Sequence, residues 1–88
     1  MITVLLVDDH TVVRAGYRHL LQSAADITIV AEAENGEEAY HLHQKLKPNV
    51  TVMDISMPGI GGLEALRRIL AQDNHARILI FTDRKSVV

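Results

Sequence analysis

The sequence contains no cysteine and no tryptophan, and aromatic residues make up only 3% of its 88 positions. The lack of cysteine excludes a disulfide framework and a thiolate metal site, and it fits a reducing cytoplasm. A strong charge of one sign is lacking as well: the net charge is -2, so this chain is not expected to bind DNA by itself. No apolar run approaches the roughly 20 residues that span a bilayer. We therefore expect a cytoplasmic protein with no membrane segment.

The composition is that of a globular protein, with 48% hydrophobic and 23% charged residues. No internal repeat, low-complexity tract or linker divides the chain. We expect residues 1–88 to form a single domain.

Short apolar runs alternate with segments of helical periodicity along the chain. Strands are predicted at 3–7, 27–33, 50–54 and 77–82, and helices at about 11–24, between Asn35 and Pro48, and around 63–70. Such alternation predicts an α/β fold, a doubly wound parallel sheet with helices on both faces and right-handed crossovers.

Apolar positions at helical spacing mark each predicted helix, and in the first two helices they share one helical face. These positions are Val13, Tyr17, Leu20, Leu21 and Ala24 in the first helix, Ala39, Leu42, His43 and Leu46 in the second, and Leu63, Leu66 and Leu70 in the third. The first helix is predicted to begin near His10 or Thr11, and Asn35 is the predicted N-cap of the second.

Two of the predicted strands end in carboxylates. Asp8 and Asp9 follow the first strand, and Asp54 closes the third. Side chains at the carboxyl ends of neighbouring parallel strands converge on one crevice, where ligands normally lie. Three carboxylates there would repel one another unless they shared a divalent cation or a proton. The sequence therefore predicts a magnesium-assisted phosphoryl-accepting site in which Asp54 is the nucleophile.

Two further groups could complete this site. The peptide oxygen of Ser56 could bind the metal, and the hydroxyl of Thr82 could donate to a phosphoryl oxygen. Plainer interpretations stay open, because acids are common at helix starts and a threonine at a strand end is often only a β-branched strand residue. Of the five histidines only His10 adjoins the acids, so it either caps the first helix or lies near the site.

These motifs resemble the receiver domain of bacterial two-component response regulators, within the subgroup that has a LuxR-type helix-turn-helix output. The resemblance covers about residues 2–82 and rests on Val7-Asp8-Asp9-His10, Val13-Arg14-Ala15-Gly16, Asp54-Ile55-Ser56-Met57-Pro58 and Gly62-Leu63-Glu64. It implies a flavodoxin-like receiver fold with strand order 2-1-3-4. It also implies site roles: Asp54 as phospho-acceptor, Asp9 as direct magnesium ligand, Asp8 as water-mediated ligand, Ser56 as ligand through its backbone oxygen, and Thr82 as switch hydroxyl.

The resemblance also implies how such a chain works. A sensor histidine kinase would donate the phosphoryl group with Mg²⁺ present, and phosphorylation would shift a two-state equilibrium. The chain would not be an enzyme beyond self-phosphotransfer and slow autodephosphorylation. DNA binding would belong to a C-terminal domain of the parent regulator, which this sequence does not encode.

The chain departs from the family pattern at its end. A receiver of this type has five strands, whereas this sequence stops at Val88, so we expect a receiver truncated after the fourth strand. The family's lysine on the fifth strand is then absent, which would slow phosphoryl uptake by weakening charge stabilisation. The apolar fourth strand would form a bare edge that favours self-association.

Two other functions compete with this one. The chain could be an interaction or dimerisation scaffold that keeps the acids but takes up no phosphate. It could also be a magnesium phosphohydrolase with an aspartyl nucleophile, but that enzyme would need a second acid two residues beyond Asp54, where this chain has Ser56.

Overall fold

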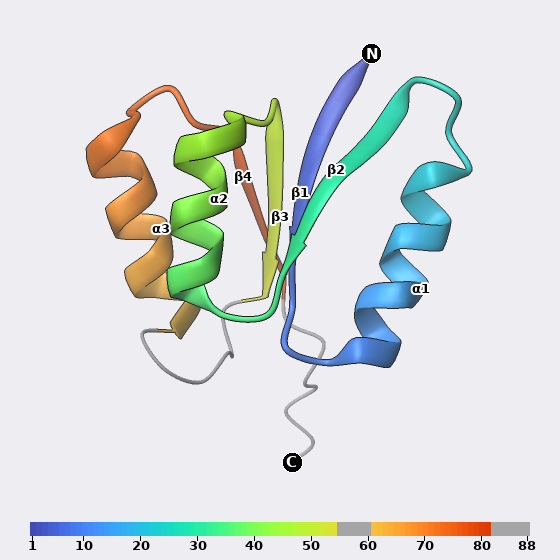
Figure 1. Cartoon of the computed structure of the whole chain (residues 1–88), viewed down its shortest axis with the longest axis horizontal. Helices are drawn as coiled ribbons and strands as arrows, with labels where there is room; N and C mark the ends of the chain where they lie inside the picture. The colour runs from blue at the N-terminus through green and yellow to red at the C-terminus, as the bar shows by residue number, and fades with distance from the viewer. Residues whose placement is uncertain (55–60, 82–88) are drawn as a thin grey trace.

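The computed structural model describes residues 1–54 and 61–81 and shows a four-stranded parallel sheet with helices on both faces (Figure 1). The elements follow one another as β1 (Ile2–Val7), α1 (Thr11–Gln22), β2 (Ile27–Ala33), α2 (Gly36–Leu46), β3 (Val50–Asp54), α3 (Gly61–Gln72) and β4 (Ile78–Phe81). None of these helices is long and apolar enough to cross a membrane, a finding that concerns the described residues alone.

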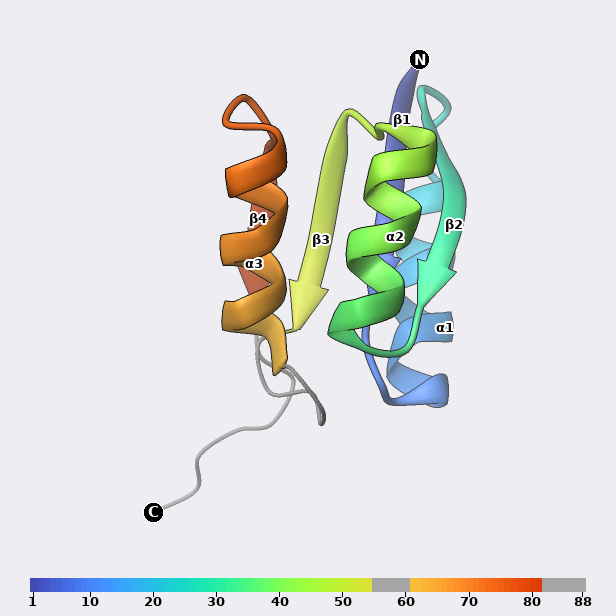
Figure 2. The ribbon, with the colours of Figure 1, turned by 60° about the vertical axis from the view of Figure 1, so that its left-hand side comes forward.

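The sheet has the strand order β2-β1-β3-β4, so the predicted order 2-1-3-4 is confirmed. One helix, α1, covers one face, while α2 and α3 lie side by side on the other (Figure 2). Every predicted element is present. The first helix ends at Gln22, earlier than predicted, and the third is longer than its leucines indicated.

Alternation along the strands divides the core between the two faces. The cluster under α2 and α3 is the larger, and its fully buried members are Leu5, Val7, Ala33, Ala39, Met53, Ala65 and Ile69. The cluster on the α1 side has three buried members, Val4, Leu6 and Val52, with half-buried side chains around them. The rings of Tyr17 on α1 and Phe81 on β4 meet here, 4.6 Å apart.

The leucines that mark α3 in the sequence do not form its buried face. Leu63 is 63% exposed, while Gly62, Ala65 and Ile69 are buried. These small residues let α3 pack closely on α2, so its buried residues lie beside the leucines and not among them. In α1, Leu20, which the sequence groups with the apolar face of that helix, is 67% exposed.

The two helices that follow β1 and β2 begin differently. Asn35 is the N-cap of α2, as predicted: its side chain accepts a hydrogen bond of 2.8 Å from the Glu38 N–H, and the Glu38 carboxylate accepts one from the Glu34 N–H. His10 is the N-cap of α1, but its side chain makes no capping hydrogen bond.

The pairing of β1 with β2 contains one irregularity. Val4 pairs with Ile29, but the next residue, Leu5, pairs with Ala31. The register therefore passes over Val30, as at a β-bulge.

Candidate functional site

Two acids come together because β1 and β3 are paired neighbours. Val7 is the partner of Met53, so the residues that follow, Asp8 and Asp54, lie beside each other at the carboxyl ends of the strands. Both side chains are fully buried. They share the strand parity of Leu6 and Val52, which places them toward the α1 side of the sheet.

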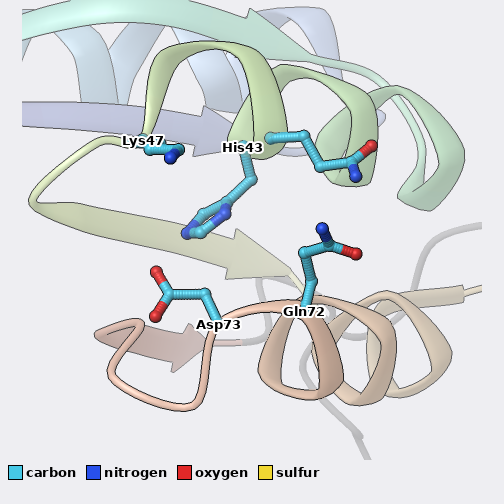
Figure 3. Close-up of a pocket in the computed structure, with 5 residues that line it drawn as sticks. His43, Lys47, Gln72 and Asp73 are labelled. Atoms are coloured by element: carbon cyan, nitrogen blue, oxygen red, sulfur yellow. The ribbon is translucent and has the colours of Figure 1, made fainter.

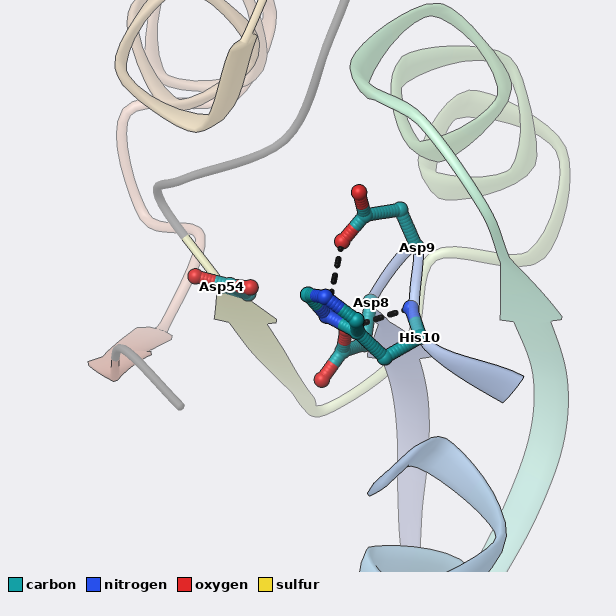
Figure 4. A group of neighbouring side chains, drawn as sticks. All are labelled: Asp8, Asp9, His10 and Asp54. Carbon is teal, nitrogen blue, oxygen red and sulfur yellow. Dashed lines mark hydrogen bonds and ion pairs between the residues drawn. The ribbon is translucent and has the colours of Figure 1, made fainter. Parts of the chain in front are cut away.

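Asp9 and His10 complete the group, as Figure 4 shows. One ligand atom from each of Asp8, Asp9, His10 and Asp54 lies within 4.8 Å of the others. Acids that are far apart in the sequence thus converge at the carboxyl ends of the two inner strands. Their separation is compatible with one small cation shared among them.

The polar atoms of Asp8 show why its carboxylate is well placed for a cation. Its N–H donates to the Ala33 carbonyl at 3.0 Å, and its Oδ1 accepts from the His10 N–H at 2.8 Å. Its Oδ2 is buried and accepts no hydrogen bond from the described residues. A buried carboxylate oxygen without a donor is costly, and a hard divalent cation would satisfy it. The donor set of carboxylate oxygens therefore fits Mg²⁺.

His10 lies between the two acids that precede it. Its Nδ1 is 3.2 Å from Asp8 Oδ1 and 3.1 Å from Asp9 Oδ1, and Figure 4 shows the ring between these carboxylates. His10 occupies the N-cap position of α1 without a side-chain capping hydrogen bond, and it lies at the acidic site.

Arg14 is a site residue to which sequence reasoning gave no role. Its Nη1 donates to the backbone oxygen of Asp8 at 2.7 Å, and its Nε donates to Glu32 Oε1 at 2.8 Å. Arg18, one turn later on α1, donates to the other oxygen of Glu32 at 2.8 Å. The available signal was a glutamate in an apolar strand together with two arginines at helical spacing.

Glu32 is held in its charged form by these arginines. Burial raises the pKa of Glu32. Hydrogen bonds from Arg18 and Arg14, together with their charges, lower it by more than burial raises it, so the pKa lies below the usual value of 4.5. The pair of arginines thus anchors α1 to β2 beside the acids.

Two predicted site residues, Ser56 and Thr82, lie outside the described residues. Their predicted roles as a backbone metal ligand and a switch hydroxyl remain predictions. The observed geometry of the site concerns Asp8, Asp9, His10 and Asp54.

A cavity of about 470 Å³ lies away from the acids, between the last turns of α2 and α3. Figure 3 shows the His43 ring pointing toward Asp73 across this space, with Lys47 and Gln72 beside it. Burial lowers the pKa of His43 below its usual 6.5, although Asp73 acts in the opposite direction. The acidic cluster and this cavity are therefore different places.

Comparison with known families decides what kind of site this is. The family model described as "Response regulator receiver domain" matches residues 4–88. The chain belongs to this family. Receiver domains are signalling modules of two-component systems rather than classical enzymes, and they bind Mg²⁺ at an acidic pocket.

Relatives of this receiver domain include the response regulator UvrY of Escherichia coli, which is 48% identical over 82 residues. The match covers 93% of this chain and 38% of UvrY. The chain thus spans less than two fifths of the length of the curated relatives that it matches first.

Solved structures confirm the receiver fold. A LuxR-family two-component response regulator from Aurantimonas superposes with a TM-score of 0.92 at 46% identity, over 97% of this chain and 61% of that one. A DNA-binding response regulator of the LuxR family from Staphylococcus aureus gives a TM-score of 0.87 at 30% identity, over 97% of this chain and 71% of that one. The flavodoxin-like fold and the LuxR-type resemblance are both confirmed.

Proposed function

We propose that Asp54 accepts a phosphoryl group from a sensor histidine kinase, with Mg²⁺ bound by the neighbouring acids. The observation that carries this proposal is the convergence of Asp8, Asp9 and Asp54 with ligand atoms less than 5 Å apart, in a chain of the receiver family. Asp54 is the last residue of β3, one of the two inner strands of the sheet, and its side chain is fully buried.

The metal would be held by the carboxylates of Asp8, Asp9 and Asp54, with the backbone oxygen of Ser56 as a further ligand. Support comes from the buried Asp8 Oδ2, which has no hydrogen-bond donor among the described residues. When bound, Mg²⁺ would offset the charge of the carboxylates and of the incoming phosphoryl oxygens.

In the transfer step a carboxylate oxygen of Asp54 attacks the phosphorus of the kinase's phosphohistidine. The new oxygen–phosphorus bond forms as the phosphorus–nitrogen bond breaks, and the imidazole nitrogen that is released takes a proton from solvent. The chain supplies position and electrostatics, which is what phosphoryl transfer requires of a protein. Self-phosphotransfer from small donors and slow autodephosphorylation follow from the same site, and the hydroxyl of Thr82 would act as the switch.

The proposed output is regulation of transcription by a longer parent protein. The similarity to LuxR-family regulators, one of which is described as DNA-binding, supports this output. DNA would be bound by a part of the parent outside these 88 residues, whose net charge of -2 does not favour DNA. The proposed setting is the cytoplasm, because such a regulator must reach DNA.

Beryllofluoride, an analogue of the phosphoryl group, tests the site directly. NMR titration of the 88-residue chain with beryllofluoride should show a saturable complex only when Mg²⁺ is present. Asp54→Asn should abolish the complex, whereas Asp26→Asn, which removes an exposed carboxylate, should leave it intact. Binding by the Asp54→Asn variant, or equal binding without Mg²⁺, would refute the proposal. The absence of any complex in the wild-type chain would favour the scaffold function.

We further propose that the chain self-associates through β4. Among the described strands β4 pairs only with β3, and its Leu79 is 60% exposed. An apolar strand with an unpaired edge pairs readily with another chain. Light scattering after size-exclusion chromatography should show a dimer whose population falls in Leu79→Lys but not in Leu63→Lys, which charges an equally exposed leucine on α3. A stable monomer at high concentration would contradict this.

A further inference from the structure

The residue that carries the further inference is Arg14, on the first turn of α1. The Arg14 side chain is only 12% exposed, and its guanidinium reaches three partners. Nη1 donates to the Asp8 backbone oxygen at 2.7 Å, Nε donates to Glu32 at 2.8 Å, and Nη2 lies 3.6 Å from Glu34 Oε1. A planar, always charged fork of this kind is suited to joining several acceptors in fixed directions.

We infer that Arg14 is a positioning residue for the metal site, acting by fixing the peptide that carries the Asp8 carboxylate. This inference rests on the proposed Mg²⁺ site. Asp8 lies one residue beyond the end of β1 and outside the paired residues of its ladders. Arg14 binds that carbonyl from one side, and the Ala33 carbonyl binds the Asp8 N–H from the other. With both ends of the residue fixed, the Asp8 carboxylate is held among Asp9, His10 and Asp54.

The anchor for Arg14 is Glu32 of β2. Glu32 accepts from Arg14 at Oε1 and from Arg18 at Oε2, both at 2.8 Å. Arg14 is therefore tied to a strand of the sheet, not only to its own helix, and the Asp8 peptide takes its position from β2. Arg18 shares this anchor, whereas Arg14 donates to the Asp8 carbonyl as well, and this difference makes Arg18 the matched control.

A purely Coulombic role for Arg14 predicts the opposite effect on the metal. A guanidinium near the acids repels a divalent cation, so removing it should strengthen Mg²⁺ binding. A positioning role predicts weaker binding, because the Asp8 carboxylate loses its fixed direction. Residues that orient metal ligands through hydrogen bonds typically contribute about 10- to 100-fold to metal affinity. The direction of the change therefore separates the two roles.

The test is Mg²⁺ titration of the 88-residue chain, followed by NMR, with amide exchange of His10 as a second readout. The His10 N–H donates to Asp8 Oδ1, so its exchange reports on the orientation of that carboxylate. Arg14→Met should weaken Mg²⁺ binding by about tenfold and speed His10 exchange. Arg18→Met should leave both within about twofold, although it too removes an ion pair with Glu32.

Arg14→Lys keeps the charge but lacks the fork, and it serves if Arg14→Met does not fold. This variant should also bind Mg²⁺ more weakly than Arg18→Met and show faster His10 exchange. Mg²⁺ binding by the Arg14 variants that equals or exceeds that of Arg18→Met would overturn the inference. If the wild-type chain bound no Mg²⁺, the proposed function would fail instead, so the two failures are distinguishable.

Discussion

The two faces of the sheet differ in the side chains that they bury. The face under α2 and α3 is filled by apolar side chains from five elements, and its cluster has seven fully buried members. The α1 face has three buried apolar members, and next to them lie the buried acids Asp8 and Asp54 and the Arg14–Glu32 pair. Packing thus stabilises the fold mainly from one side, while the other side holds the acids of the proposed metal site.

The largest expected effect on stability comes from truncating core side chains, one on each face of the sheet. Ile69→Ala on α3 should lower the free energy of unfolding by about 3 kcal/mol, because Ile69 is fully buried in the larger cluster. Leu21→Ala, at a half-buried position of α1, should cost less than half as much. Urea denaturation measures both, and Ile69→Val gives a milder step if the alanine variant is unfolded. Equal costs on the two faces would remove the distinction.

The acids should lower stability when no metal is bound. Asp54→Asn removes one negative charge from a group of three carboxylates, so it should raise the free energy of unfolding by about 1 kcal/mol in buffer containing a chelator. Adding Mg²⁺ should stabilise the wild-type chain and not the variant. Thermal unfolding with and without Mg²⁺ gives the measurement. A variant that is less stable than wild type in chelator would show that the acids are not a source of strain.

The starts of α2 and α1 offer a comparison at the level of single hydrogen bonds. Asn35→Ala removes the side-chain oxygen that accepts from Glu38 N–H and should cost about 1 kcal/mol. Asn35→Asp keeps an acceptor at that place and should cost much less. Chemical denaturation of the two variants measures the difference, and equal losses would show that the cap contributes nothing.

The smallest expected effect is a pH dependence from His43. Burial disfavours its charged form, so the folded chain takes up this proton at lower pH than the unfolded chain does. Between those two pKa values the unfolded chain binds more protons, and stability should fall as pH falls from 6.5 through the lower, folded pKa.

Denaturation midpoints measured over this pH range should fall less steeply in His43→Gln than in the wild type. His41→Gln, at an exposed position on the same helix, is the control and should keep the full slope. Asp73 and Lys47 line the same cavity as His43 and stay unchanged in both variants. A slope that is unaffected by His43→Gln would assign the pH dependence to other groups.

Sequence patterns predicted the order of elements and the meeting of the acids, because both depend on simple periodicities. Asp8 follows β1 and Asp54 ends β3, and the carboxyl ends of adjacent parallel strands lie at the same end of the sheet. The buried face of α3 was not predicted, because Leu63 is a stronger apolar signal than Gly62 or Ala65. The role of Arg14 was not predicted either, because its partner is a peptide oxygen, and every residue type has one.

The skipped residue in β2 sets which way Glu32 points. Before Val30, Ile27 and Ile29 face the α1 cluster, whereas after it Ala31 belongs to the cluster of the other face. Strict alternation through Val30 would have turned Glu32 away from the arginines and into apolar surroundings. The alternation of side chains shifts by one residue at Val30. Deleting or inserting one residue there would therefore turn Glu32 toward the apolar cluster and Ala31 toward α1. The count of residues in this strand, as much as their chemistry, is what keeps the carboxylate on the side where it is used.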